Sequence, residues 1–250
     1  MKHLIPFRIY ESQETSGLTK EQVKFLNKCI SGTWSVNPSN GLVDVQGDFN
    51  CSRERLESLL DISFGHVSGD FDCYDNQLTS LAGAPQKVDG DFNCFHNNLK
   101  SLEGAPRTVG GNFDCSPNDL KSLEGAPQTV NGNFDCSNNK LQSLSGAPQT
   151  INGDFLCDEF QLDQGEWNMQ GWVEVLDTGS EEAQKLILTL PWLQPDWWNL
   201  ELQRDPGKTV HLLSTMWNHM PKDMQSAIKI PKGYEGDFEL FSGFDELGLF

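Results

Sequence analysis

The sequence has few basic residues and no long apolar run. It contains 18 Lys and Arg against 36 Asp and Glu, for a formal net charge of −18. Because binding to a phosphate backbone needs clustered basic groups, we expect no direct contact with nucleic acid. No stretch approaches the roughly 18 apolar residues of a membrane span, and the apolar patch 4–7 before Arg8 is too short for a signal peptide. We therefore expect no membrane association and a cytoplasmic location.

Recognisable catalytic and metal-binding motifs are missing as well. The chain has five histidines and no G-x-S-x-G, phosphate-binding-loop, H-E-x-x-H or G-x-G-x-x-G sequence. Its seven cysteines include no closely spaced pair of the kind that zinc sites use. Acidic residues are abundant, but nothing predicts the desolvating pocket that acid–base catalysis needs. We expect a non-enzymatic protein with no catalytic residue, no cofactor and no metal.

A repeat occupies the centre of the chain. Gly-Asp/Asn-Phe-x-Cys recurs, and its cysteines are separated by 22 residues once and then by 21 residues four times. Its phenylalanines are Phe49, Phe71, Phe92, Phe113, Phe134 and Phe155, and its cysteines are Cys51, Cys73, Cys94, Cys115, Cys136 and Cys157. One unit reads F-x-C-x-x-N-x-L-x-S-L-x-G-A-P-x-x-V. Such a period indicates a solenoid, in which each unit buries its apolar side against its neighbours.

The unit resembles the leucine-rich repeat, whose L-x-L-x-x-N-x-L core it matches with Phe and Cys in the first two apolar positions. The resemblance covers about residues 45–162, or six coils, and implies a buried ladder of asparagine side chains that hydrogen-bond the turning backbone. Those asparagines are Asn76, Asn97, Asn118 and Asn139, with Glu54 and Phe160 in their place in the end coils. The short unit with proline on its outer side is similar to repeats of bacterial effectors and tailed-phage proteins. This likeness implies a phage-encoded protein.

The predicted fold is a mainly β solenoid of leucine-rich-repeat type with parallel strands on its concave face. We expect Phe and Cys to point inward and Gly-Ala-Pro to form a tight convex turn. An N-terminal α/β cap over residues 1–44 should hold a helix that starts at a Thr19–Gln22 capping box, followed by strands at 32–36 and 41–45.

A C-terminal module over residues 163–250 is rich in tryptophan and predicted to be mainly helical. Its expected helices span 181–190, 210–220 and 223–230, each ended by a proline. Trp192, Trp197 and Trp198 either pack on the last coil or form an exposed patch for a partner.

Three roles are open for the six repeated cysteines. Disulfides between adjacent coils would be strained, since parallel strands lie about 4.8 Å apart with parallel side-chain directions. Zinc binding is not indicated, because the cysteines lack the close spacing that zinc sites use. Free cysteine is small and apolar, so we expect reduced core residues, in agreement with a reducing compartment.

The outward positions of the repeat predict a partner-binding surface. Two columns of Asp and Asn flank a third column in which Tyr74 and Phe95 occupy equivalent positions on adjacent coils. The candidate residues are Asp70, Asp72, Tyr74, Asp75, Asp91, Phe95, His96, Asp114 and Asp135. They suit a protein partner with a basic surface, because aromatic anchors supply affinity and charges supply steering. Two alternatives remain open: the acidic columns only keep the strands soluble, or they bind calcium.

The acidic, hydrophobic C-terminal tail is a second candidate binding site. Its apolar residues are Phe244, Leu247, Leu249 and Phe250. The last five residues resemble the bacterial sliding-clamp-binding pentapeptide Q-L-S/D-L-F, with Glu246 and Gly248 in place of the usual residues. The alternative is a tail folded back onto the helical module.

Three functions follow for such a protein. The first is a binding protein that inhibits or sequesters a host defence or regulatory protein. The second is a replication or transcription accessory recruited to a sliding clamp by the tail. The third is a DNA mimic whose carboxylates imitate phosphates and block a nucleic-acid-binding enzyme. The oligomeric state is not indicated by the sequence.

Overall fold

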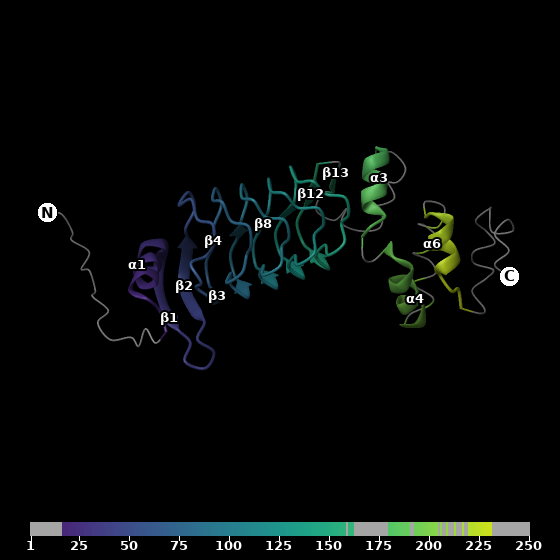
Figure 1. Cartoon of the computed structure of the whole chain (residues 1–250). Coiled ribbons are helices and arrows are strands. Elements are labelled where there is room, and N and C mark those ends of the chain that lie inside the picture. The colour runs from purple at the N-terminus through teal and green to yellow at the C-terminus, as the bar shows by residue number, and fades with distance from the viewer. Residues whose placement is uncertain are drawn as a thin grey trace.

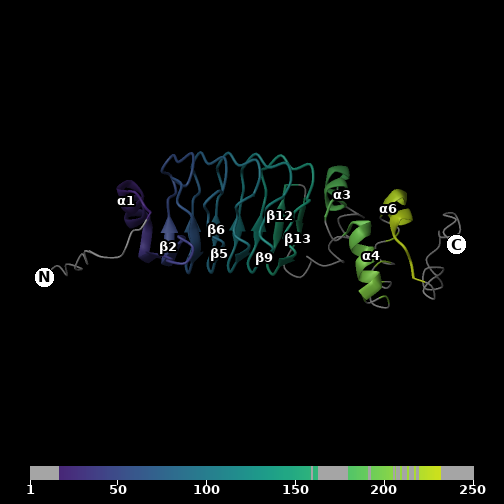
Figure 2. The same ribbon diagram turned by 60° about the horizontal axis from the view of Figure 1, so that its bottom comes forward.

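The protein is a parallel β-solenoid with an N-terminal helix and a C-terminal group of helices (Figure 1). The computed structural model describes residues 17–158, 160–162, 180–190, 193–204, 206, 209, 213, 217 and 220–231. In two views the coils stack side by side in sequence order, with α1 at one end and α3, α4 and α6 at the other (Figures 1 and 2). The predicted mainly β solenoid with parallel strands is confirmed.

The N-terminal cap consists of a helix and an antiparallel strand pair. Helix α1 (Lys20–Cys29) begins at the predicted capping box, in which the Thr19 hydroxyl accepts from the Gln22 amide and the Gln22 side chain accepts from the Thr19 amide. The helix buries Leu26 and Cys29 against the first coil. Strand β1 (Ile30–Val36) then pairs with β2 (Val43–Asn50), so the predicted strands are confirmed.

Each coil contributes two short parallel strands, and strand β2 connects the two resulting sheets. Its first half pairs with β3 and its second half pairs with β4. The phenylalanine sheet continues through β4 (Phe71–Asp72), β6 (Phe92–Asn93), β8 (Phe113–Asp114), β10 (Phe134–Asp135) and β12 (Phe155–Cys157). The second sheet continues through β3 (Phe64–Val67), β5 (Lys87–Val88), β7 (Thr108–Val109), β9 (Thr129–Val130) and β11 (Thr150–Ile151). The sequence predicted the first sheet only.

The Gly-Ala-Pro segments are tight turns, as predicted. In the coil of β4, the Ala84 amide donates to the Leu81 carbonyl at 2.9 Å, and Gly83 lies between them with a φ of 90°. A positive φ at the third residue is the pattern of a type II turn, which glycine adopts without steric cost. The same geometry recurs at Gly104, Gly125 and Gly146. These turns leave no room for a helix on this side of the coil.

The core of the solenoid consists of columns of identical side chains. From Phe71 to Phe155, successive rings stack with centroids 5.2–5.6 Å apart and planes within 9° of parallel. The repeated cysteines lie beside them, and the central ones, Cys73 to Cys136, have no exposed surface. All seven cysteines are free thiols. Phe and Cys therefore point inward, which confirms the predicted orientation.

A ladder of buried asparagines joins neighbouring coils through the backbone. The Asn97 side-chain oxygen accepts from the Leu78 amide at 3.0 Å, and its amide group donates to the Cys73 and Cys94 carbonyls at 3.0 Å. Asn118 repeats this arrangement one coil further on. Each asparagine thus satisfies backbone groups of two coils, which would otherwise be buried without partners.

Replacing Asn97 with alanine should lower the free energy of unfolding by about 1–3 kcal/mol, because a buried amide and buried carbonyls lose their partner. Asn98 is the matched control, since its side chain is exposed on the same turn. Thermal melts of Asn97→Ala and Asn98→Ala measure the difference. Equal melting temperatures would contradict a structural role for the ladder.

The ladder stops at the two ends for different reasons. Glu54 takes the asparagine position in the first coil and pairs with Lys28 of α1 at 2.5 Å, so its carboxylate binds the cap. Phe160 begins β13 (Phe160–Leu162), which pairs antiparallel with β12. Because the chain reverses there, this position no longer belongs to a parallel coil.

The C-terminal module contains helices α3 (Glu181–Ile187), α4 (Pro195–Arg204) and α6 (Lys222–Ala227). The first and last agree with predicted helices, although each ends about three residues earlier than predicted. The predicted helix at 210–220 lies mostly outside the described residues. Helix α4 was not predicted. The Thr189 hydroxyl accepts from the Leu144 amide at 2.6 Å and so connects the module to the solenoid.

Helix α4 decides between burial and exposure for one of the three candidate tryptophans. Trp198 has no exposed surface, so it is buried and does not contribute to an exposed patch. Trp192 and the side chain of Trp197 lie outside the described residues. Asn199 of the same helix bridges to the end of α6 through the Ala227 carbonyl and the Lys229 amide.

Candidate functional site

Two aromatic rings stack on the outer face of the phenylalanine sheet. Strands β4 and β6 pair in register, with Phe71 opposite Phe92, and this register places Tyr74 directly beside Phe95. Their ring centroids are 4.4 Å apart and their planes are within 6° of parallel. Both side chains are half-buried. The predicted contact between the Tyr74 and Phe95 rings is therefore present.

An arginine that the sequence interpretation overlooked extends this patch. The guanidinium carbon of Arg53 lies 5.6 Å from the centroid of the Tyr74 ring, within the range of a cation–π contact. Arg53, Tyr74 and Phe95 therefore form a three-layer arrangement, which we call the aromatic stack. Its members come from three successive coils.

Asp75 and His96 border the aromatic stack. The Asp75 carboxylate accepts from Arg53 Nε at 3.2 Å with one oxygen and lies 3.1 Å from His96 Nδ1 with the other. The next outward column holds Arg53, Asp75 and His96 at equivalent positions of three successive coils, with φ values between 55° and 62°. This fourth outward column, with a cation, an anion and a histidine in sequence, is a signal that could have identified Arg53.

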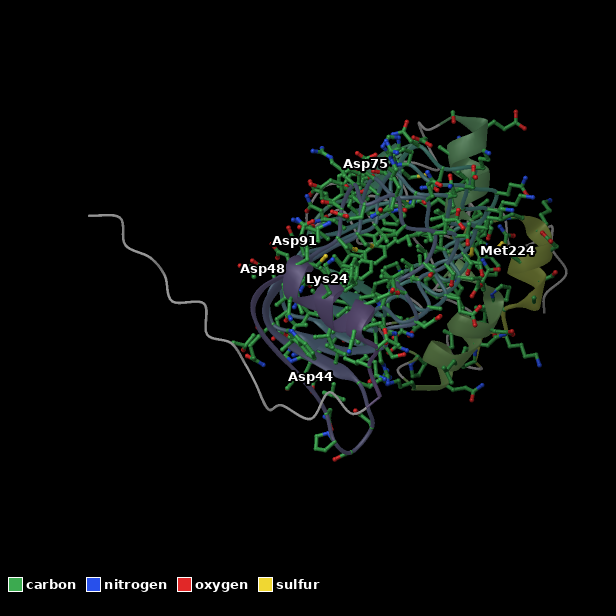
Figure 3. The ribbon with its side chains drawn as sticks, turned by 60° about the vertical axis from the view of Figure 1, so that its left-hand side comes forward. Lys24, Asp44, Asp48, Asp75, Asp91 and Met224 are labelled. Carbon is green, nitrogen blue, oxygen red and sulfur yellow. The ribbon has the colours of Figure 1, made fainter. Side chains whose placement is uncertain are left out.

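The first acidic column holds the coils together. Asp48, Asp70 and Asp91 each direct one carboxylate oxygen at the backbone amide of the equivalent residue in the next coil, at 2.7–3.1 Å. Asn112 and Asn133 continue the series. Figure 3 shows Asp48, Asp91 and Asp75 along one edge of the molecule, whereas Asp44 lies on another. Asp70 and Asp91, both candidate partner contacts, therefore have a structural role.

Close packing explains why glycine precedes each residue of this column. A Cβ atom on Gly90 would lie 2.2 Å from the Asp70 carboxylate oxygen, and one on Gly111 would lie 2.1 Å from that of Asp91. Only glycine leaves space for the coil-to-coil hydrogen bond. The recurring Gly-Asp and Gly-Asn pairs were the sequence signal for this second ladder.

The second column changes character halfway along the solenoid. Asp72 accepts hydrogen bonds from the side-chain amides of Asn50 at 3.1 Å and Asn93 at 2.7 Å, one from each side. Burial raises the pKa of the Asp72 carboxyl, the Asn93 hydrogen bond lowers it, and neighbouring carboxylates including Asp70 raise it further, for a raised pKa overall. Asp72 is thus enclosed between two amides.

Asp114 and Asp135 are adjacent in the same column without an amide between them. They are directly paired in register on β8 and β10. Each uses one oxygen to accept from a serine amide two residues later, Ser116 or Ser137, at 2.9 Å. Burial raises the pKa of Asp114 most, the Ser116 hydrogen bonds lower it and the Asp135 charge raises it, so that its pKa is raised overall. Two carboxylates therefore lie side by side on neighbouring coils.

Metal binding and membrane insertion receive no geometric support from the part of the chain that the structure describes. Within those residues, no group of three His, Cys, Asp or Glu side chains is arranged to hold a metal ion, calcium included. No helix among the described segments is long and apolar enough to cross a membrane. The tail residues Phe244, Leu247, Leu249 and Phe250 lie outside the described residues.

The fold defines a class: a repeat protein built as a parallel β-solenoid of 21-residue coils with phenylalanine, cysteine and asparagine ladders. Comparisons of the chain with protein-family models, with curated proteins and with solved structures found no match.

Proposed function

We propose that this protein is a non-enzymatic binding protein that docks another protein on the aromatic stack. The observation that carries the proposal is the Tyr74–Phe95 pair, which stacks at 4.4 Å on the outer face of the sheet rather than in the core. Large aromatic side chains at a half-exposed position supply most of the affinity in many interfaces, and a charged border supplies steering. Asp75 and His96 form such a border.

The partner and its setting belong to the same proposal. A net charge of −18 favours a partner with a basic surface. The resemblance to leucine-rich repeats of tailed-phage proteins supports a phage-encoded protein that acts in the host cytoplasm. There it would inhibit or sequester a defence or regulatory protein. The free, buried cysteines suit a reducing compartment.

Replacing both Tyr74 and Phe95 with alanine should weaken capture of the partner from host lysate by about thirtyfold or more, which corresponds to about 2 kcal/mol. The rings lie outside the core, so the melting temperature should change little. Quantitative mass spectrometry of proteins captured by the immobilised wild type and variant measures the effect.

A variant that lacks residues 247–250 is the matched control, and its capture should be nearly intact. Capture that survives Tyr74→Ala with Phe95→Ala but disappears with this deletion would contradict the proposal and favour recruitment to a sliding clamp. Capture of a basic DNA-binding protein that declines steeply with salt, and is insensitive to both variants, would favour DNA mimicry.

A further inference from the structure

The aromatic stack is closed on one side by the protein's own arginine. The Arg53 guanidinium covers the outer face of Tyr74 at 5.6 Å and donates to the Asp75 carboxylate at 3.2 Å. A cation on a ring and a carboxylate beside it is a favourable arrangement, because the ring quadrupole and the negative charge attract the same group. In this chain a guanidinium therefore already occupies one face of the stack.

The opposite side of the stack has no such cover. Among the described residues, Tyr74 provides the only ring contact of Phe95. The next two positions in this column are Ser116 and Ser137, whose side chains are too short to cover a ring. The face of the Phe95 ring that points away from Tyr74 therefore lies next to two small serine side chains and has no ring stacked on it among the described residues.

Two carboxylates, those of Asp114 and Asp135, lie near this face of the Phe95 ring. Asp114 precedes Ser116 by two residues on the same face of the strand, and the Ser116 hydroxyl donates to it at 2.7 Å. The Ser116 hydroxyl therefore uses one oxygen of Asp114, and the Ser137 amide uses one oxygen of Asp135. Within the described part of the chain, the second oxygen of each carboxylate has no hydrogen-bond donor. A cation above Ser116 would meet both.

We propose that the uncovered face of Phe95, with Asp114 and Asp135, binds the guanidinium of an arginine side chain from a partner protein. This inference rests on the proposed function, since it names the group that the docked partner inserts. The inserted arginine would extend the stack to four layers, with Arg53 at one end and the partner's arginine at the other.

Arginine fits this position better than lysine. Its planar guanidinium stacks on an aromatic face and still presents N–H groups at its edge to two carboxylates. Lysine offers a compact ammonium that cannot lie flat on the ring, and its stronger hydration opposes burial beside Phe95. The negative charge of the two carboxylates therefore attracts arginine and lysine alike, whereas stacking on the Phe95 ring favours arginine.

The test measures binding of two short peptides, acetyl-Gly-Arg-Gly-amide and acetyl-Gly-Lys-Gly-amide, by NMR titration of the ¹⁵N-labelled full chain. The arginine peptide should shift the amides of Ser116 and Asp114 and bind about three- to fivefold more tightly than the lysine peptide. In Phe95→Leu the preference should fall to about one. Asp114→Asn with Asp135→Asn should weaken both peptides, and asparagine already occupies this column at Asn50 and Asn93.

A blocking variant separates stacking from general attraction to the acidic chain. Ser116→Tyr places a ring where the guanidinium would lie and should abolish the Ser116-centred shifts, whereas Ser101→Tyr, at an exposed position, should leave them unchanged. Equal binding of the two peptides, or binding that survives Ser116→Tyr, would overturn the inference. If capture still depends on Tyr74 and Phe95 in that case, the proposed function stands without it. If the arginine preference holds and capture fails, the site stands and the proposed function falls.

Discussion

The free energy of unfolding should fall by about 5–7 kcal/mol between pH 8 and pH 10 under reducing conditions. Burial raises the pKa of Cys51, Cys73, Cys94, Cys115 and Cys136 far above the usual value of 9.0. In the unfolded chain these thiols regain an ordinary pKa. A tenfold change in proton concentration above that pKa is worth about 1.4 kcal/mol per thiol, and five thiols together approach the whole stability of a typical domain.

The direction follows from proton binding. Below about pH 8 the thiols are protonated in both states, so their stabilising contribution is fully present. As the pH rises through 9, the unfolded chain releases protons that the folded chain retains, so stability falls with pH. The loss continues until the raised pKa of the folded state is reached. Cys29 in α1 contributes over a narrower window, because burial raises its pKa only to about 11.

Urea denaturation at pH 7, 8, 9 and 10 with a reducing agent measures this slope. Cys94→Ala is the informative variant. It should be less stable at pH 7, because it leaves a small cavity. Its free energy of unfolding should nevertheless fall by about 1.4 kcal/mol less than that of the wild type between pH 8 and pH 10, because one thiol fewer releases a proton on unfolding. This comparison removes the contribution of lysine and tyrosine titration, which both proteins share. A flat profile, or identical slopes for the two proteins, would show that these thiols are accessible to water in the folded state.

The parts of the fold that follow from the period were predictable. In a stack of parallel coils with constant length, equivalent residues must lie above one another, so the columns at Phe71, Cys73 and Asn76 could be assigned before the structure. The second sheet could not, because a strand such as Lys87–Val88 has a single buried residue and lacks the alternation that Phe-x-Cys gives the first sheet. Helix α4 was not predicted: it begins at Pro195, only four residues after Pro191, the residue expected to end the preceding helix.

The candidate site was predictable only where the interacting side chains occupy equivalent positions of adjacent coils. Tyr74 and Phe95 share a column, so their stacking followed from the repeat. The role of Arg53 depends on its reach across to a ring in a different column. For Asp70 and Asp91, the sequence could not decide whether a carboxylate faces water or the next backbone amide. That choice depends on the space that the neighbouring glycine leaves.

Replacing Phe113 with alanine should lower the free energy of unfolding by about 3–5 kcal/mol, the upper range for loss of a buried aromatic ring. Phe113 has no exposed surface and stacks between Phe92 and Phe134 with centroid distances of 5.3 Å on both sides. In a solenoid each coil contacts only its neighbours, so no distant contact compensates for the cavity. The variant should also weaken the coupling between the two halves of the stack.

Hydrogen exchange followed by mass spectrometry tests both effects. In the wild type, amides around Phe71 and Phe134 should open with similar free energies, whereas in Phe113→Ala they should differ because the halves open separately. Phe113→Leu is the control: leucine fills most of the volume and should cost less than about 1.5 kcal/mol while the halves stay coupled. A similar cost for both variants would mean that the planar ring matters more than the filled volume. Unchanged exchange in Phe113→Ala would contradict nearest-neighbour coupling, because a cavity at Phe113 interrupts the column of stacked rings that joins the two ends of the solenoid.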